Sequence, residues 1–216
     1  MANAALATPS TNIWNPSTDI QPLHVVHFGI DNYSSVSNNS GGGYSFPTDY
    51  GLTYGLAPGL EVGIDFFSPA AHPVQFNAKY GMPERGAAPA WAVGVQNVGT
   101  KAGATNYNIA YAVLSKQYAP VGRFTVGGYR GNRGLLVDGD GRPAATGLIL
   151  AWDRSFGKRW WGALDWATGR SFCGAFAAGA SYKFAPNASL ILGYVFFRNH
   201  VANPKNLLTT QLDIDL

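Results

Sequence analysis

The chain has 216 residues, of which only 12% are charged, and its mean hydropathy is −0.03. It contains no apolar run of about 20 residues, which excludes a helical membrane protein, and its single cysteine, Cys173, excludes an internal disulfide. The length suits one large all-β domain of the sandwich or barrel kind.

Residues 1–21 are polar and rich in Asn, Thr, Ser and Pro, with one tryptophan, Trp14. We expect this segment to be an N-terminal periplasmic tail or a lumen plug, and residues 22–216 to form a β-barrel. The N-terminus has neither the basic stretch nor the apolar stretch of a signal peptide. We therefore expect a mature or recombinant chain from which the signal is missing.

The clearest pattern in the chain is a hairpin over residues 50–67. Apolar side chains alternate there with glycine, threonine and carboxylates on both sides of a turn at residues 57–59. Because successive side chains of a strand point to opposite faces, one face is apolar and the other polar. The pattern recurs along the chain, and no amphipathic helix is available to cover the apolar face. We predict that lipid covers it and that the polar face lines a lumen.

About twelve segments follow this pattern, near the ten residues that a tilted strand needs to cross hydrocarbon. They are predicted at about 23–32, 50–56, 60–67, 74–81, 91–96, 107–116, 123–129, 148–153, 160–166, 176–183, 190–196 and 208–216. In the sixth, we expect Tyr107, Ile109, Tyr111 and Val113 to face lipid. Short Pro/Gly turns alternate with longer polar loops. The pattern predicts an all-β, transmembrane, antiparallel up-and-down β-barrel with short periplasmic turns and longer extracellular loops.

Charged residues obey the same alternation. An Arg or Lys facing lipid at mid-depth costs roughly 2–4 kcal/mol, so a membrane wall must direct its charges inward. The charged residues expected to line the lumen are Asp31, Asp49, Glu61, Asp65, Lys79, Lys116, Arg123, Asp153, Asp165, Lys183 and Asp213. Acids and bases gather on different strands, which predicts a transverse field. The alternative is a set of ion pairs that brace the wall.

Basic residues outnumber acidic ones at the end with the longer loops. This expected extracellular basic rim consists of Lys101, Arg130, Arg133, Arg142, Arg170, Arg198 and Lys205. Such a rim can concentrate anionic solutes or contact lipopolysaccharide phosphates, and it accounts for a pI near 9.0 without nucleic acid. A solvated rim without a ligand is the alternative.

From Leu23 to Leu216 the chain resembles bacterial outer-membrane β-barrel proteins. Residues 209–216 look like the terminal assembly signal of that class, in which hydrophobic residues occupy alternate final positions. Gln211 stands where glycine is common, and Leu216 stands where an aromatic residue is common. The resemblance implies an outer-membrane location, a surrounding lipid bilayer, and recognition of the C-terminal strand by the barrel-assembly machinery.

The expected inward row is rich in glycine and alanine, which leaves room for water in a cylinder roughly 24 Å across. We therefore expect a porin-like passive diffusion channel for small polar solutes or ions. The alternative is a barrel plugged by residues 1–21 or by its loops, which would serve as an anchor or scaffold.

An outer-membrane enzyme is the third class of function. The four histidines, His24, His27, His72 and His200, are scattered, and no serine stands beside one in a recognisable motif. We therefore do not expect an enzyme. The chain also lacks Cys/His metal spacing, a phosphate-binding glycine loop and a haem attachment motif, so no cofactor or metal is expected.

Overall fold

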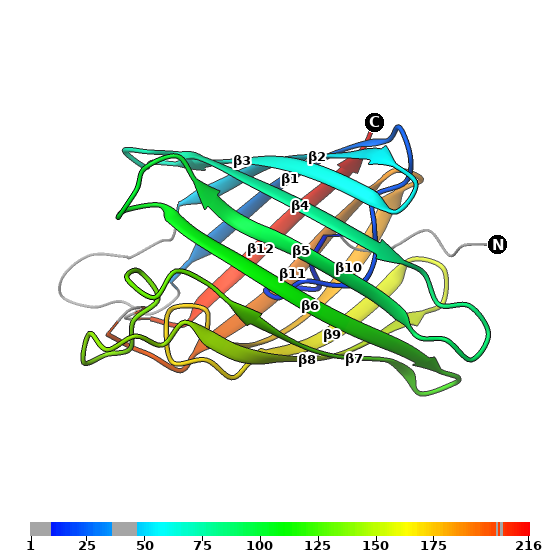
Figure 1. Cartoon of the computed structure of the whole chain (residues 1–216). Coiled ribbons are helices and arrows are strands. Elements are labelled where there is room, and N and C mark those ends of the chain that lie inside the picture. Colours follow the sequence, from blue (N-terminus) through cyan, green and yellow to red (C-terminus); the bar gives the residue numbers. More distant parts are fainter. Residues whose placement is uncertain (1–9, 36–46, 202, 204) are drawn as a thin grey trace.

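The computed structural model describes residues 10–35, 47–201, 203 and 205–216. These residues form a closed antiparallel barrel in which each strand pairs with its neighbours in sequence and β1 pairs with β12 (Figure 1). Its strands are β1 (Val26–Ser34), β2 (Thr48–Ala57), β3 (Leu60–Ser68), β4 (Val74–Met82), β5 (Ala90–Gly99), β6 (Asn106–Tyr118), β7 (Gly122–Arg130), β8 (Thr146–Phe156), β9 (Trp160–Ala167), β10 (Ala175–Ala185), β11 (Ala188–Phe197) and β12 (Leu207–Asp215). The predicted twelve-stranded all-β barrel is confirmed.

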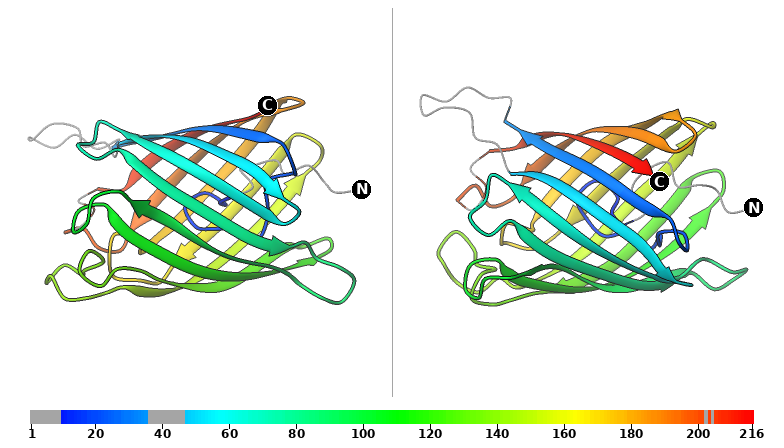
Figure 2. Two further views of the ribbon diagram at one scale, coloured as in Figure 1. Left: turned by 45° about the horizontal axis from the view of Figure 1, so that its top comes forward. Right: turned by 90° about the horizontal axis from the view of Figure 1, so that it is seen from above.

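The two ends of the barrel differ in their connections. At one end, which we name the short-turn end, short turns join the strands, as at residues 58–59, 119–121, 157–159 and 186–187. At the other, the long-loop end, the described connections include residues 131–145 and 168–174. The strands are strongly tilted (Figure 2). Among the described residues, no helix is long and apolar enough to cross a membrane.

The outer face of the barrel is apolar. Large hydrophobic side chains are exposed on it in strand after strand, as the alternating sequence predicts; examples are Leu52, Ile64, Phe76, Val93, Val126, Leu150, Leu164, Phe176 and Leu192. Polar residues at the alternate positions are buried inside; examples are His27, Thr53, Glu61, Gln75, Thr125, Asp153, Ser181 and Gln211. The outer face of the wall is therefore apolar, and the polar side chains of the strands face the lumen.

The predicted orientation of β6 is wrong. Ile109 and Val113 are each 2% exposed and lie inside, whereas Leu114 is 48% exposed on the outer face. The inward row of this strand has the larger apolar side chains and the outward row has mostly small ones, so hydrophobic alternation selects the wrong row. Pairing identifies the outward row, because Ala112 lies directly opposite Val93 of β5, which faces outward. Directly paired residues share a face of the sheet.

Lys116 is corrected together with its strand. It does not line the lumen but shares the outward register of Leu114, near the short-turn end. Its ammonium group forms an ion pair with Glu84 at 2.8 Å and donates to the carbonyl oxygen of Gly86. The ammonium of Lys116 and the backbone N–H of Gln117 lower the pKa of Glu84.

Side chains fill much of the barrel interior. One apolar cluster on the inner face of β5–β9 packs against Leu136 from the loop 131–145 and Cys173 from the loop 168–174. A second cluster lies on the inner face of β9–β12 and contains Ile13, a residue of the N-terminal segment. Both loops and the N-terminal segment therefore contribute to the core of the barrel.

The orientation of β6 can be tested by substitution at its centre. We expect Ala112→Arg to lower the free energy of unfolding by about 2–4 kcal/mol, because the guanidinium would face lipid at mid-depth. The measurement is denaturant unfolding of the protein in lipid vesicles. Ala102→Arg in the exposed loop 100–105 is the matched control and should change little. A tolerated Ala112→Arg would contradict the orientation.

Candidate functional site

Residues 10–21, the lumen segment, lie inside the barrel (dark blue in Figures 1 and 2). The segment folds back on itself, since the backbone N–H of Ser17 donates to the carbonyl oxygen of Ser10 at 3.1 Å. A short connection, residues 22–25, leads from it to β1 and bonds to β2 through Gly55. Residues 1–9 of the predicted tail or plug lie outside the described residues.

Asp165 of β9 holds the turn of the lumen segment. One of its carboxylate oxygens accepts hydrogen bonds from the backbone N–H groups of Ile13, Trp14 and Asn15 at 2.8, 2.9 and 3.2 Å. The other accepts from the side-chain amide of Asn15 at 3.0 Å. Consecutive N–H groups that converge on one point form a preorganised anion site. A carboxylate that is 1% exposed is thus fully hydrogen-bonded by the segment.

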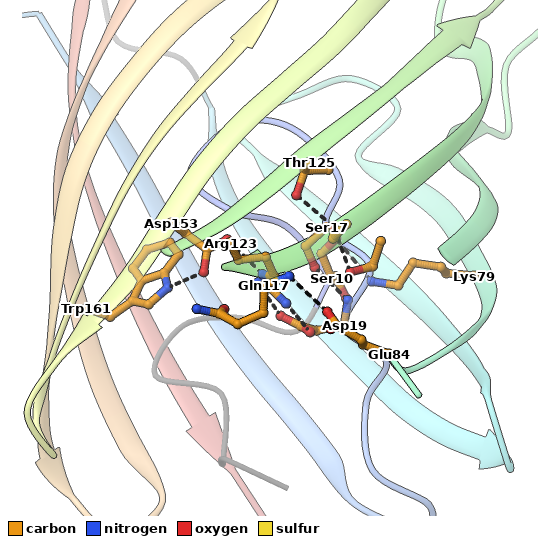
Figure 3. A network of polar contacts seen from close by, with 12 residues as sticks. Ser10, Ser17, Asp19, Lys79, Glu84, Gln117, Arg123, Thr125, Asp153 and Trp161 are labelled. Carbon is orange, nitrogen blue, oxygen red and sulfur yellow. Dashed lines mark hydrogen bonds and ion pairs between the residues drawn. The ribbon is translucent and has the colours of Figure 1, made fainter. Parts of the chain in front are cut away.

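Arg123 of β7 holds the segment near its end (Figure 3). Its two terminal nitrogens donate to the two oxygens of Asp19 at 2.6 and 2.7 Å, and its Nε donates to Asp153 at 2.8 Å. Bidentate pairs of this kind are among the stronger polar contacts in proteins. Asp153 also accepts from the indole N–H of Trp161 at 3.1 Å. Arg123 therefore joins the segment to the wall.

The pKa of Asp19 has two opposing causes. Burial raises it, but the charge and hydrogen bonds of Arg123 prevail, so it lies below the ordinary value of 3.8. A lowered folded-state pKa gives stability that is present above the ordinary value and is lost as the pH falls through the lowered one. The contact between Asp19 and Arg123 therefore persists at mildly acidic pH.

A third attachment joins both ends of the lumen segment to one buried ion pair. Lys79 of β4 and Glu61 of β3 lie 3.3 Å apart, and their side chains are 1% and 2% exposed. Glu61 accepts from the hydroxyl of Ser10 at 2.7 Å and from the backbone N–H of Gln21 at 2.6 Å. Lys79 donates to the carbonyl oxygen of Ser10 at 3.2 Å. The ion pair closes the loop of the segment at its base.

Two paired glycines leave space for the apolar part of the segment. Gly179 of β10 lies directly opposite Gly193 of β11. A Cβ atom at either position would approach the side chain of Ile13 to 3.1 or 3.3 Å. Inward glycines were expected to leave room for water, but this pair accommodates Ile13. Trp14 packs edge-on against Tyr33 and Phe197, with ring centroids 5.6 and 5.2 Å away.

A cavity of about 230 Å³ remains beside the lumen segment. Asp31, Asp49 and Asp65 line it, and Asp31 lies directly opposite Asp49 on the paired strands β1 and β2. Asp65 accepts a hydrogen bond from the side-chain amide of Asn77 at 2.8 Å. Within the described part of the chain, no cation forms an ion pair with these three residues. The cavity wall, which His27 and Lys79 also line, therefore carries three carboxyl groups that form no ion pair with any described residue.

The predicted lumen-lining residues thus fall into groups. Asp31, Asp49 and Asp65 line the cavity, and Glu61 and Lys79 line it as well. The attachments of the lumen segment are formed by Glu61, Lys79, Arg123, Asp153 and Asp165. Asp213 contacts His27 at 3.2 Å, and Lys183 lies opposite Ser189 in the inward register of β10. Because Lys79 and Arg123 are paired with acids, they do not form an uncompensated basic wall opposite the cavity.

The seven residues of the predicted basic rim are spread around the long-loop end. Lys101, Arg130, Arg133, Arg142, Arg170 and Arg198 are exposed, and Lys205 is partly buried. Arg142 pairs with Asp140 at 3.3 Å, and Arg170 pairs with Asp138 at 3.6 Å. The rim is therefore partly neutralised by the acids of the loop 131–145.

Several residues of the site were not predicted from the sequence. Asp19, Asn15, Ser10 and Gln21 make most of the contacts of the lumen segment, yet they are ordinary residues of a polar tail. The adjacent apolar residues Ile13 and Trp14 were the available signal. Among the described residues, no group of three or more His, Cys, Asp or Glu side chains is arranged to hold a metal ion.

Neither a protein-family model nor a curated protein matches the sequence. Among solved structures, the chain is similar to the KdgM porin, with a TM-score of 0.58 and 8% identity over 89% of this chain and 99% of that chain. Weaker similarities reach an outer membrane channel from Pseudomonas putida F1 (TM-score 0.46, 11% identity, 91% and 97% covered) and Salmonella typhi OmpF (TM-score 0.47, 8% identity, 89% and 96% covered). The first of these likenesses shows that the fold is that of a porin-like outer-membrane barrel.

The role of Asp165 can be tested by hydrogen exchange. We expect Asp165→Ala to raise the exchange rates of the amides of Ile13, Trp14 and Asn15 by about 10- to 100-fold, because a hydrogen bond to a buried charged group contributes about 1.5–3 kcal/mol. The measurement is exchange followed by mass spectrometry in detergent micelles. Asp140→Asn in an exposed loop is the control. Unchanged rates in Asp165→Ala would show that other contacts hold the segment.

Proposed function

We propose that this protein is a porin-like channel of the bacterial outer membrane whose lumen segment restricts passage. The observation that carries the proposal is the attachment of residues 10–21 to three parts of the inner wall, at Asp165, at Arg123 and at the Glu61–Lys79 pair. A segment held in this way reduces the open cross-section, and a cavity remains beside it. The fold shared with the KdgM porin supports the same function.

The remaining cavity favours small cations among the solutes. Its three aspartates form no ion pair among the described residues, and acidic residues outnumber the bases His27 and Lys79 in its lining. An excess of one sign of charge in a narrow site concentrates ions of the opposite sign. The exposed arginines of the rim lie toward the same end of the barrel as these aspartates, but in loops and at strand ends where solvent screens them. The carboxyl groups of the cavity therefore control ion preference.

A closed structural barrel is the second candidate function. It is favoured by the loops 131–145 and 168–174, which place Leu136 and Cys173 in the apolar cluster of the lumen. Such packing would leave the barrel without conductance even when the lumen segment is absent. The two candidates therefore differ in the behaviour of a truncated chain.

Single-channel recording in a planar bilayer separates these candidates. We expect the full chain to give small conductance steps and a chain lacking residues 1–21 to give steps several-fold larger, because the segment occupies the lumen. Asp165→Ala should give intermediate or fluctuating steps, and Asp140→Asn is the control. Equal steps from the full and truncated chains would overturn the restricting role of the segment. Silence from both folded chains would select the closed structural barrel.

The charge preference has its own measurement, the reversal potential under a salt gradient. We expect the full chain to prefer cations and the double variant Asp31→Asn, Asp49→Asn to shift the reversal potential toward zero, because two carboxyl groups of the cavity wall are removed. Asp138→Asn at the rim is the matched control, since it removes an acid outside the cavity. A shift of equal size in the control would assign selectivity to the rim instead.

A further inference from the structure

Arg154 lies on the outer face of β8, where lipid is expected. It follows Trp152 in the outward register, and it lies directly opposite Gly162 of β9. A guanidinium on a lipid face is unfavourable unless the side chain reaches the membrane interface. The Arg154 guanidinium carbon lies 5.2 Å from the ring centroid of Phe156, the last residue of the strand. The side chain is therefore directed toward the short-turn end.

An aromatic row marks the interface at this end of β8–β10. Phe156 lies opposite Trp160, and Trp160 lies opposite Tyr182, with the centroids of the latter two rings 4.8 Å apart. Aromatic residues form such girdles at the level of lipid headgroups. Arg159, in the turn after Phe156, donates to the hydroxyl of Tyr182 at 3.2 Å. Its guanidinium therefore also lies at this girdle.

Three positively charged residues of this hairpin form no ion pair within the described part of the chain. Arg154, Lys158 and Arg159 lie within one hairpin, and Lys158 and Arg159 are exposed. Across the described ranges, none of the three forms an ion pair with a carboxylate. Lys116, the neighbouring outward cation, differs because it is paired with Glu84. An uncompensated cationic group at headgroup level is complementary to a phosphate.

The wall next to these charges has space for a lipid. On the outer face, Gly162, Ala178 and Ala180 carry small or no side chains and lie on the adjacent strands β9 and β10. Toward the membrane centre follows an apolar groove of about 630 Å³ that crosses β6–β10. Its lining includes Leu114, Phe124, Leu150, Trp152, Leu164, Trp166 and Phe176. A groove with this lining matches an acyl chain.

We propose that Arg154, Lys158 and Arg159 bind the phosphate of an anionic phospholipid in the leaflet at the short-turn end, with an acyl chain in the adjacent groove. Charged nitrogens donate strong hydrogen bonds to phosphate oxygens, and arginine is suited to bidentate contact. Because no carboxylate of a described residue pairs with these side chains, the site has no negatively charged acceptor for the ammonium of a zwitterionic headgroup. The ligand class is therefore a phospholipid such as phosphatidylglycerol, whose headgroup carries no amine.

The test is lipid retention by the full chain, measured by native mass spectrometry after reconstitution with phosphatidylglycerol and phosphatidylcholine. We expect preferential retention of phosphatidylglycerol and an affinity about tenfold lower in the double variant Arg154→Gln, Lys158→Gln. Phosphatidylcholine retention should not change. Arg154→Lys should retain most of the affinity. Arg130→Gln, which removes an outward cation at the long-loop end, is the matched control.

Gly162→Leu tests the space without a change of charge. A Cβ atom at position 162 would already lie 3.3 Å from the Phe156 ring. A leucine side chain should therefore fill the space left by Gly162, Ala178 and Ala180 and weaken phosphatidylglycerol retention. Heat-resistant migration on gels would confirm that each variant is folded. Equal retention of both lipids by the natural chain, an equal loss in Arg130→Gln, or no effect of Gly162→Leu would overturn the proposal. Displacement of the lipid by inorganic phosphate at millimolar concentration would also overturn it, because the site would then recognise a simple anion.

Discussion

Hydrocarbon provides no hydrogen-bond partner for the backbone or for a charged side chain, and this constraint determines most of the structure. Pairing of β1 with β12 leaves no free sheet edge, so each strand forms backbone hydrogen bonds with a neighbouring strand on both sides. The same constraint directs most charges of the wall inward, where they must be neutralised in a narrow space. Glu61 does this with Lys79, and Arg123 does it with Asp153. The charged and polar side chains that cannot face lipid are therefore gathered in the lumen.

The lumen segment completes this neutralisation. Asp165 forms no ion pair with a described residue and is satisfied by the N–H groups of residues 13–15, while Arg123 takes Asp19 as its second carboxylate. The segment is therefore part of the electrostatic balance of the wall as well as an obstacle in the path. A barrel without it would have to hydrate the same groups with water. The stability of the wall and the closure of the lumen are linked through these contacts.

The sequence was sufficient for the fold because in most strands a row of large apolar side chains alternates with small or polar ones. It failed for β6, where the row of larger apolar side chains, with Tyr111 and Val113, faces inward, so only the pairing with β5 identifies the outward row. The sequence also identified the charges that hold the lumen segment, such as Asp165, but not their partners. A carboxylate that binds backbone N–H groups leaves no side-chain signature, and contacts between residues 150 positions apart depend on the closed barrel.

The connection of residues 22–25 between the lumen segment and β1 is short, and it is bonded to β2 through Gly55. A segment that detaches from Asp165 would therefore stay within a few residues of its binding wall. Short tethers give effective concentrations in the millimolar range or above. Rebinding of the segment to the wall would then be an intramolecular event. A solute of low affinity would not compete with it effectively. The segment would occupy the lumen for most of the time, and openings of such a channel would be brief. Their frequency would depend on the strength of the contacts at Asp165 and Arg123.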